Sequence, residues 1–157
     1  MIPFYKHNLV NKNYLKKTLQ SYYLTSGPKC EEVENILKKR FSKNFAYLTN
    51  SWTNSVISIL LALKIKKGDE IIIPACTFVA CANVIEMAGG KVVFADIDKK
   101  TKLMDIDDCL KKINKKTKII MPVHLYGNIF PTYKLKKKIR KNIIVIEDSA
   151  HAFSGEY

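Results

Sequence analysis

The chain has 157 residues and an average globular composition, with 47% hydrophobic and 26% charged side chains. This length fits one domain of roughly 150 residues with its own core. The composition excludes disorder, a collagen-like fibre and a small disulfide scaffold, and no apolar run reaches the length of a membrane span. The first residues, MIPFYKHNLVNKN, lack the apolar middle of a signal peptide, so we expect a cytoplasmic protein without a membrane partner.

The net charge of +13 raises the question of nucleic-acid binding. Residues 1–50 carry 9 basic and 3 acidic side chains, residues 111–157 carry 11 and 3, and the part between carries 7 and 8. Only Arg40 and Arg140 are arginines, whereas proteins that read nucleic acids commonly use the planar guanidinium. The pattern favours solvated, lysine-rich helix faces over a surface that binds polyanions. We therefore expect no specific nucleic-acid partner.

The four cysteines suggest reduced, buried thiols. They form no C-x-x-C pair, and no histidine lies at zinc-finger spacing from them, so we expect no metal site. A metal site built from His124, His151 and Asp148 is a less favoured alternative, because these residues have no recognised ligand spacing.

Two helices are predicted in the N-terminal part of the chain. Residues 13–23 place aromatic and leucine side chains near helical spacing, and a turn signal follows at 25-TSGP-28. Residues 31–41 have acids in the first helical turn and bases in the last, as the helix dipole favours. We therefore treat residues 1–45 as an N-terminal helical segment.

From residue 46 the pattern changes to short apolar runs separated by helical stretches. Strands are predicted at 46–49, 70–74, 91–96, 118–123 and 142–148. Helices are predicted at 54–65, 78–88, 105–113 and 132–140, with Thr77 and Asp105 as N-caps. The runs are continuous rather than alternating, which is typical of parallel strands buried on both faces. Residues 46–157 therefore predict an α/β domain in three layers, with a mainly parallel sheet between helices.

Polar residues follow the predicted strands, where open parallel sheets bind ligands. The turn 49-TNSWTNS-55 opens a helix whose N–H groups favour an anion, although an N-capped helix without a ligand fits equally well. In 146-IEDSAHAF-153, Asp148 ends an apolar strand and His151 follows three residues later. Such a carboxylate needs a partner, either the next helix or the protonated ring nitrogen of a pyridine cofactor.

Taken in order, these segments resemble the N-terminal part of sugar aminotransferases of the DegT/DnrJ/StrS type. These enzymes use pyridoxal phosphate (PLP) on the fold type I scaffold, so the resemblance implies part of that scaffold's large domain. The matching stretches span nearly all of the chain and are 27-GPKCEEVE-34, 49-TNSWTNS-55, 68-GDEIIIPACTFVACANVI-85, 89-GGKVVFADID-98, 117-TKIIMPVHLYG-127 and 144-IVIEDSAHAF-153.

The resemblance implies cofactor contacts at five positions. Asp148 would pair with the pyridinium nitrogen of PLP, and His151 would hydrogen-bond the phenolic oxygen of its ring. Phe78 would stack on the ring face. Thr53 and the backbone of Asn54 would bind the phosphate, in agreement with the anion preference of a helix N-terminus. One departure is Trp52, where many family members have glycine.

The reaction implied by the resemblance is amination of a nucleotide-linked keto sugar, usually with glutamate as donor, for surface polysaccharide or related glycan synthesis. Family enzymes are homodimers and well over twice this length, and their Schiff-base lysine lies in a segment beyond the position of Tyr157. We therefore expect a truncated chain that contains no catalytic residue and is inactive alone. A non-catalytic binding or regulatory module of the same fold is the alternative.

Overall fold

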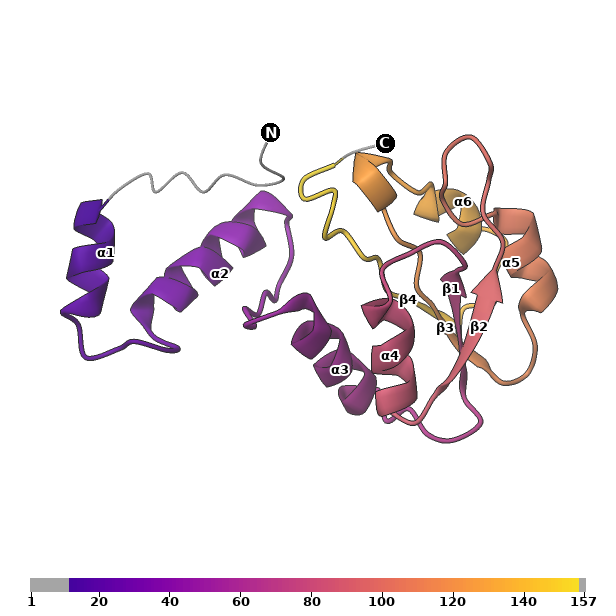
Figure 1. Ribbon diagram of the computed structural model, residues 1–157, viewed down its shortest axis with the longest axis horizontal. Helices are drawn as coiled ribbons and strands as arrows, with labels where there is room; N and C mark the ends of the chain where they lie inside the picture. Colours follow the sequence, from indigo (N-terminus) through magenta and orange to yellow (C-terminus); the bar gives the residue numbers. More distant parts are fainter. Residues whose placement is uncertain (1–11, 156–157) are drawn as a thin grey trace, which may run out of the picture. The chain divides into compact units, whose positions relative to one another are not determined.

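The computed structural model describes residues 12–155, which divide between Leu48 and Thr49 into two compact units. The N-terminal unit contains helices α1 (Lys12–Leu19) and α2 (Pro28–Arg40), drawn in Figure 1. Helix α2 begins at Pro28, whose fixed φ suits a first helical position, and its last turn is basic, as the helix dipole favours. Helix α1 is shorter than predicted, because the Ser21 hydroxyl donates to the Thr18 carbonyl at 2.7 Å beyond its end.

The C-terminal unit is built on a four-stranded parallel sheet in the order β2-β1-β3-β4. Its strands are β1 (Glu70–Pro74), β2 (Lys91–Ala95), β3 (Thr117–Ile120) and β4 (Ile144–Val145). Every residue of β1 is buried, as expected for a central strand covered on both faces. In the register of the sheet, Ile72 lies opposite Val93 of β2 and Ile120 of β3.

Helices cover both faces of this sheet and complete the three predicted layers. They are α3 (Trp52–Ala62), α4 (Ala80–Met87), α5 (Ile106–Lys112) and α6 (Thr132–Lys136), with a 3-10 turn η1 (Leu125–Gly127). In Figure 1, α3 and α4 lie on one side of the strands and α5 and α6 on the other, as right-handed crossovers require for this strand order. Asp105 caps α5 as predicted, since its carboxylate accepts from the N–H of Asp108 at 2.7 Å.

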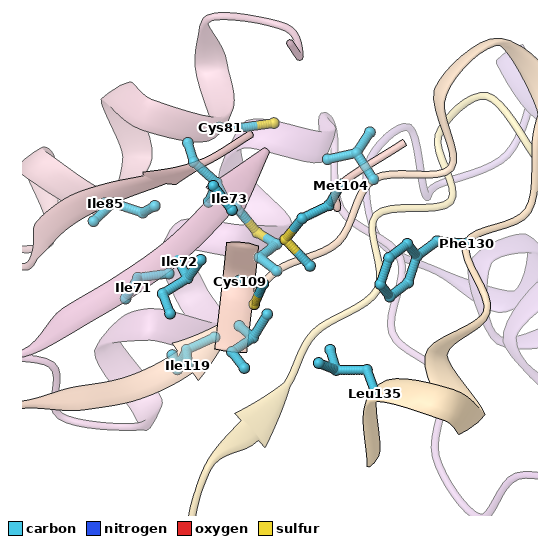
Figure 2. Close-up of a cluster of buried hydrophobic side chains, with 14 of the residues drawn as sticks. Ile71, Ile72, Ile73, Cys81, Ile85, Met104, Cys109, Ile119, Phe130 and Leu135 are labelled. Atoms are coloured by element: carbon cyan, nitrogen blue, oxygen red, sulfur yellow. The ribbon is translucent and has the colours of Figure 1, made fainter. Parts of the chain in front are cut away.

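The core of the C-terminal unit lies on both sides of β1. Figure 2 shows Ile71, Ile72 and Ile73 between side chains contributed by α4 and side chains from the opposite layer. The residues around these three include Cys81, Ile85, Met104, Cys109, Ile119, Phe130 and Leu135, all of them buried. Full burial of one large apolar side chain contributes about 1.5–3 kcal/mol, so this cluster gives the strand ends a rigid base.

None of the helices within residues 12–155 is both long enough and apolar enough to cross a membrane.

The strand predicted at residues 46–49 is not formed. These residues belong to no strand among those described, and local contacts in the N-terminal unit take the place of a ladder. The N–H of Leu48 donates to the carboxylate of Glu34 on α2 at 2.9 Å. The rings of Phe45 and Tyr47 stack with their centroids 6.5 Å apart. An apolar run is thus insufficient to predict a strand here, because pairing depends on a partner strand.

The strand predicted at residues 142–148 is regular only over β4. The N–H of Ile146 donates to the Ile120 carbonyl at 3.1 Å, and the N–H of Asp148 donates to the Pro122 carbonyl at 3.0 Å. Proline has no backbone N–H, so position 122 cannot donate the inter-strand hydrogen bond that a regular parallel ladder would have there. Pairing continues only as an isolated parallel bridge between Val123 and Asp148. Individual hydrogen bonds on either side of a proline therefore hold the segment that carries Asp148.

Candidate functional site

A pocket of about 130 Å³ lies where β1, β3 and β4 end. Its walls come from the start of α3, from the loop between β1 and α4, and from the segments that follow β3 and β4. Four of the five predicted site residues line it, namely Thr53, Phe78, Asp148 and His151. Residues that lie far apart in the chain thus meet beyond the carboxyl ends of the strands, where open parallel sheets bind ligands.

Asp148 forms the buried end of the pocket, with 7% of its surface exposed. Its Oδ1 accepts from the N–H of Ala150 at 3.0 Å, and its Oδ2 accepts from the thiol of Cys81 at 3.6 Å. A carboxylate offers about four acceptor sites. With these two partners, Asp148 keeps acceptor capacity for a donor or a cation in the pocket.

Cys81 was not among the predicted site residues. It lies on α4, lines the pocket, and has its Sγ 3.2 Å from the hydroxyl oxygen of Thr77. Burial raises the pKa of the Cys81 thiol to about 11, so the thiol is neutral at pH 7. The prediction that Thr77 caps α4 is wrong, because the helix begins at Ala80 with Val79 as N-cap. The four-residue spacing of Thr77 and Cys81 was the only sequence signal for this contact.

His151 lies at the exposed rim of the pocket. Its Nδ1 accepts from the N–H of Tyr126 at 3.4 Å, and the two rings stack with centroids 6.0 Å apart. Because Nδ1 is an acceptor, the proton of the neutral ring is assigned to Nε2, which is therefore a donor. On another wall, 71% of the surface of Phe78 is exposed, so a planar ligand can pack on this ring.

The first turn of α3 forms a further wall of the pocket. Ser51 is the N-cap, and its hydroxyl accepts from the N–H of Asn54 at 3.2 Å. Thr53 and Trp52 line the pocket, and Trp52 also packs against the core, which fixes the turn that carries Thr53. Asn54 is the one predicted site residue outside the lining. Its N–H already has a partner, so its contact with a phosphate stays a prediction.

His124 is buried outside the pocket lining. Its Nδ1 accepts from the N–H of Phe130 at 3.0 Å, and its Nε2 lies 3.3 Å from Oε2 of Glu147. Both ring nitrogens are thus engaged by protein groups, which argues against the alternative of a metal held by His124, His151 and Asp148. Within residues 12–155, no three His, Cys, Asp or Glu side chains are placed to hold a metal ion.

Comparisons with known sequences agree on one family. The model of the DegT/DnrJ/EryC1/StrS aminotransferase family matches residues 8–157. The chain is 35% identical over 160 residues to the GDP-perosamine synthase of Escherichia coli O157:H7, covering 99% of this chain and 44% of that protein. It is 36% identical over 142 residues to the UDP-4-amino-4-deoxy-L-arabinose–oxoglutarate aminotransferase of Shewanella sediminis, covering 88% of this chain and 36% of that protein.

Solved structures show the same scaffold. The PMP form of the putative sugar aminotransferase Spr1654 from Streptococcus pneumoniae is 33% identical, with a TM-score of 0.85 over 89% of this chain and 39% of that one. NtdA from Bacillus subtilis with bound PMP is 35% identical, with a TM-score of 0.85 over 91% of this chain and 33% of that one. The predicted fold type I architecture is confirmed, and the chain spans less than half the length of these relatives.

Proposed function

Because the chain belongs to the DegT/DnrJ/EryC1/StrS aminotransferase family, we propose that it forms the cofactor-binding part of a PLP-dependent sugar aminotransferase. The observation that carries this proposal is the pocket in which Thr53, Phe78, Asp148 and His151 meet. When bound, PLP supplies an electron sink for amino-group transfer. The residues of this chain bind and orient it.

The pocket residues fit the chemistry of the PLP ring. The buried carboxylate of Asp148 has acceptor capacity to pair with a protonated ring nitrogen. His151 presents Nε2 as a donor, which suits a phenolic oxygen, because Tyr126 occupies its Nδ1. The exposed ring of Phe78 is available for stacking on the flat face of the cofactor.

The start of α3 fits the phosphate group. The hydroxyl of Thr53 lies in the first turn of an 11-residue helix, where the unpaired N–H groups and the dipole favour an anion. The N–H of Asn54 would join this contact by exchanging its bond to Ser51 for one to the phosphate.

We propose a nucleotide-linked keto sugar as amino acceptor and glutamate as amino donor. Two relatives are named for GDP- and UDP-linked sugars, which supports the acceptor class, and a third, from Bacillus subtilis, is named 3-oxo-glucose-6-phosphate:glutamate aminotransferase, which supports glutamate as donor. The product would serve surface polysaccharide or related glycan synthesis of the cell envelope. We assign the reaction to the cytoplasm, since all four cysteines are free thiols, as is typical of a reducing compartment.

We further propose that the complete site is formed in a homodimer. The pocket of about 130 Å³ is smaller than a usual ligand site of roughly 300–1,000 Å³, which supports additional walls from other residues. The pocket lining among residues 12–155 includes no lysine, and the chain covers 44% of the Escherichia coli relative, so we assign the Schiff-base lysine to a segment beyond the position of Tyr157, as the family resemblance implies. Residues 1–157 alone should therefore bind PLP but not aminate a sugar.

PLP binding to residues 1–157, measured by equilibrium dialysis, tests the proposal. We expect Asp148→Asn to weaken binding about 10- to 100-fold, the value of a hydrogen bond to a charged group. Thr53→Val should weaken binding of PLP but not of pyridoxal, which has no phosphate. Asp107→Asn is the matched control, because Asp107 is an exposed carboxylate on α5 outside the pocket.

Two outcomes would contradict parts of this proposal. Equal PLP binding by the wild type and Asp148→Asn would show that this carboxylate does not hold the ring, and a stable chain without PLP binding would favour a non-catalytic module. Glutamate-dependent amination of a keto sugar by residues 1–157 alone would disprove the assignment of the Schiff-base lysine to a segment beyond the position of Tyr157.

A further inference from the structure

A chain of three polar side chains runs along one wall of the pocket, from Thr77 through Cys81 to Asp148. The Sγ of Cys81 lies 3.2 Å from Oγ1 of Thr77 and 3.6 Å from Oδ2 of Asp148. Cys81 is 1% exposed and Asp148 is 7% exposed, so water has little access to this contact. Figure 2 shows Cys81 among the buried side chains that pack around β1.

The direction of each hydrogen bond in this chain follows from the groups themselves. An ionised carboxylate can only accept, so the single hydrogen of the thiol goes to Oδ2 of Asp148. The sulfur of Cys81 then serves as acceptor for the hydroxyl hydrogen of Thr77. Burial keeps the thiol protonated, and the negative charge of Asp148 favours the same state.

We propose that Cys81, supported by Thr77, is a positioning residue that fixes Oδ2 of Asp148 toward the ligand in the pocket. The inference rests on the proposed function, in which Asp148 pairs with the ring nitrogen of PLP. It adds that the orientation of this carboxylate depends on a thiol donor on α4, 67 residues earlier in the chain. Ala150 holds the other oxygen, so the two donors together define the carboxylate plane.

The first test needs no cofactor, since it reads the thiol by the S–H stretching band in infrared difference spectra. The Cys81 band is identified by subtracting the spectrum of Cys81→Ser from that of the wild type. Hydrogen bonding weakens the S–H bond, so Asp148→Ala should shift this band to higher frequency. The Cys109 band is the matched control, because Cys109 is a second buried thiol, on α5, outside the pocket lining.

If Asp148→Ala is poorly folded, Asp148→Asn keeps the shape and should give a smaller shift in the same direction. An unchanged Cys81 band in a folded Asp148 variant would overturn the proposal.

The second test measures PLP affinity in three cysteine variants. Cys81→Ala removes the donor and should weaken PLP binding about three- to tenfold, as expected for the loss of one hydrogen bond. Cys81→Ser retains a donor and should restore most of the affinity, which a purely structural role would not explain. Cys109→Ala removes a buried thiol elsewhere and should leave PLP affinity unchanged.

The two tests separate the positioning role from the proposed function. Equal PLP affinity of Cys81→Ala and the wild type would overturn the role of Cys81, even where PLP binds. Failure of every variant to bind PLP would contradict the proposed function, whereas the infrared shift would still decide whether Cys81 holds Asp148.

Discussion

Two buried carboxylates stand at opposite ends of the sheet's strands and differ in their partners. Glu70, at the amino end of β1, accepts from the side-chain amide of Asn114 at 2.6 Å and from the ammonium of Lys91 at 3.3 Å. Asp148, beyond the carboxyl end of β4, accepts from one backbone N–H and a thiol. The amide of Asn114 holds the pKa of Glu70 below its ordinary value of 4.5.

Burial alone does not separate these two carboxylates, since Glu70 is 6% exposed and Asp148 is 7% exposed. What separates them is the strength and location of their donors. Glu70 accepts hydrogen bonds from the amide of Asn114 and the ammonium of Lys91. It does not line the pocket that contains Asp148. Asp148 is held by a weak thiol donor and one N–H, beside a pocket. A buried acid with unused acceptor capacity is therefore the better candidate for ligand binding.

The largest effect is expected at His124, which supports the segment carrying Asp148. His124→Ala removes the acceptor for the N–H of Phe130 and one of several partners of Glu147, and leaves a cavity. We expect a loss of about 3 kcal/mol in the free energy of unfolding, measured by urea denaturation. His124→Asn retains an acceptor for Phe130 and should recover about 1 kcal/mol. Equal losses in both variants would rule out the Phe130 contact as a source of stability.

A smaller effect on stability is expected at Glu70. Glu70→Gln exchanges the charged acceptor of Asn114 for a neutral one and should reduce the free energy of unfolding by about 1–2 kcal/mol. PLP affinity should stay unchanged, in contrast to Asp148→Asn. Lys91→Met is the control for the ion pair and should cost at most about 0.5 kcal/mol, because the Lys91 side chain is 67% exposed. Loss of PLP affinity in Glu70→Gln would remove the distinction between the two carboxylates.

The smallest effect concerns Asn114, whose contribution to the free energy of unfolding should change with pH. A carboxyl whose pKa is lowered on folding stabilises the folded protein fully at pH values above its ordinary, unfolded-state pKa. This stabilisation is lost as the pH falls through the lower pKa of the folded state. Asn114→Ala should therefore cost about 1 kcal/mol more at pH 7 than at pH 3, measured by urea unfolding at both values. The loss that remains at pH 3 includes the bond from the N–H of Lys116 to Asn114 at 2.8 Å.

Glu70→Gln provides the background that isolates this effect. In that variant the acid cannot ionise, so adding Asn114→Ala should cost the same at pH 7 and pH 3. A persistent difference would assign the pH dependence to other groups.

Much of the sheet is predictable from sequence because burial on both faces leaves a continuous apolar run. This holds for β1, which is buried throughout and forms over the predicted residues 70–74. Strand β2 also forms where predicted, although most of its residues are exposed or half-buried, and β3 ends at Ile120 instead of the predicted residue 123. The run at residues 46–49 looks similar but has no strand partner among the described residues, a property that no local pattern contains. The last strand is shortened by Pro122, which lies on the neighbouring strand segment rather than in the run itself.

In the candidate site, too, some residues are predictable from the local sequence, whereas others depend on contacts between distant parts of the chain. Asp148, His151 and the turn that contains Thr53 stand next to predicted elements at one edge of the sheet, and the family resemblance selects them together with Phe78. Cys81 is missed because its contact with Asp148 depends on a distance to a residue in another part of the chain.

The backbone at Tyr126 restricts which sequences this protein can tolerate. Tyr126 holds φ at 55°, and Gly127 follows at 84°, so both residues are in the left-handed region. A β-branched side chain at position 126 is strongly disfavoured by backbone sterics, whatever the pocket binds. Asparagine or glycine would satisfy the backbone but would remove the ring that stacks on His151. Variation at this position is thus limited by two independent requirements, one conformational and one aromatic.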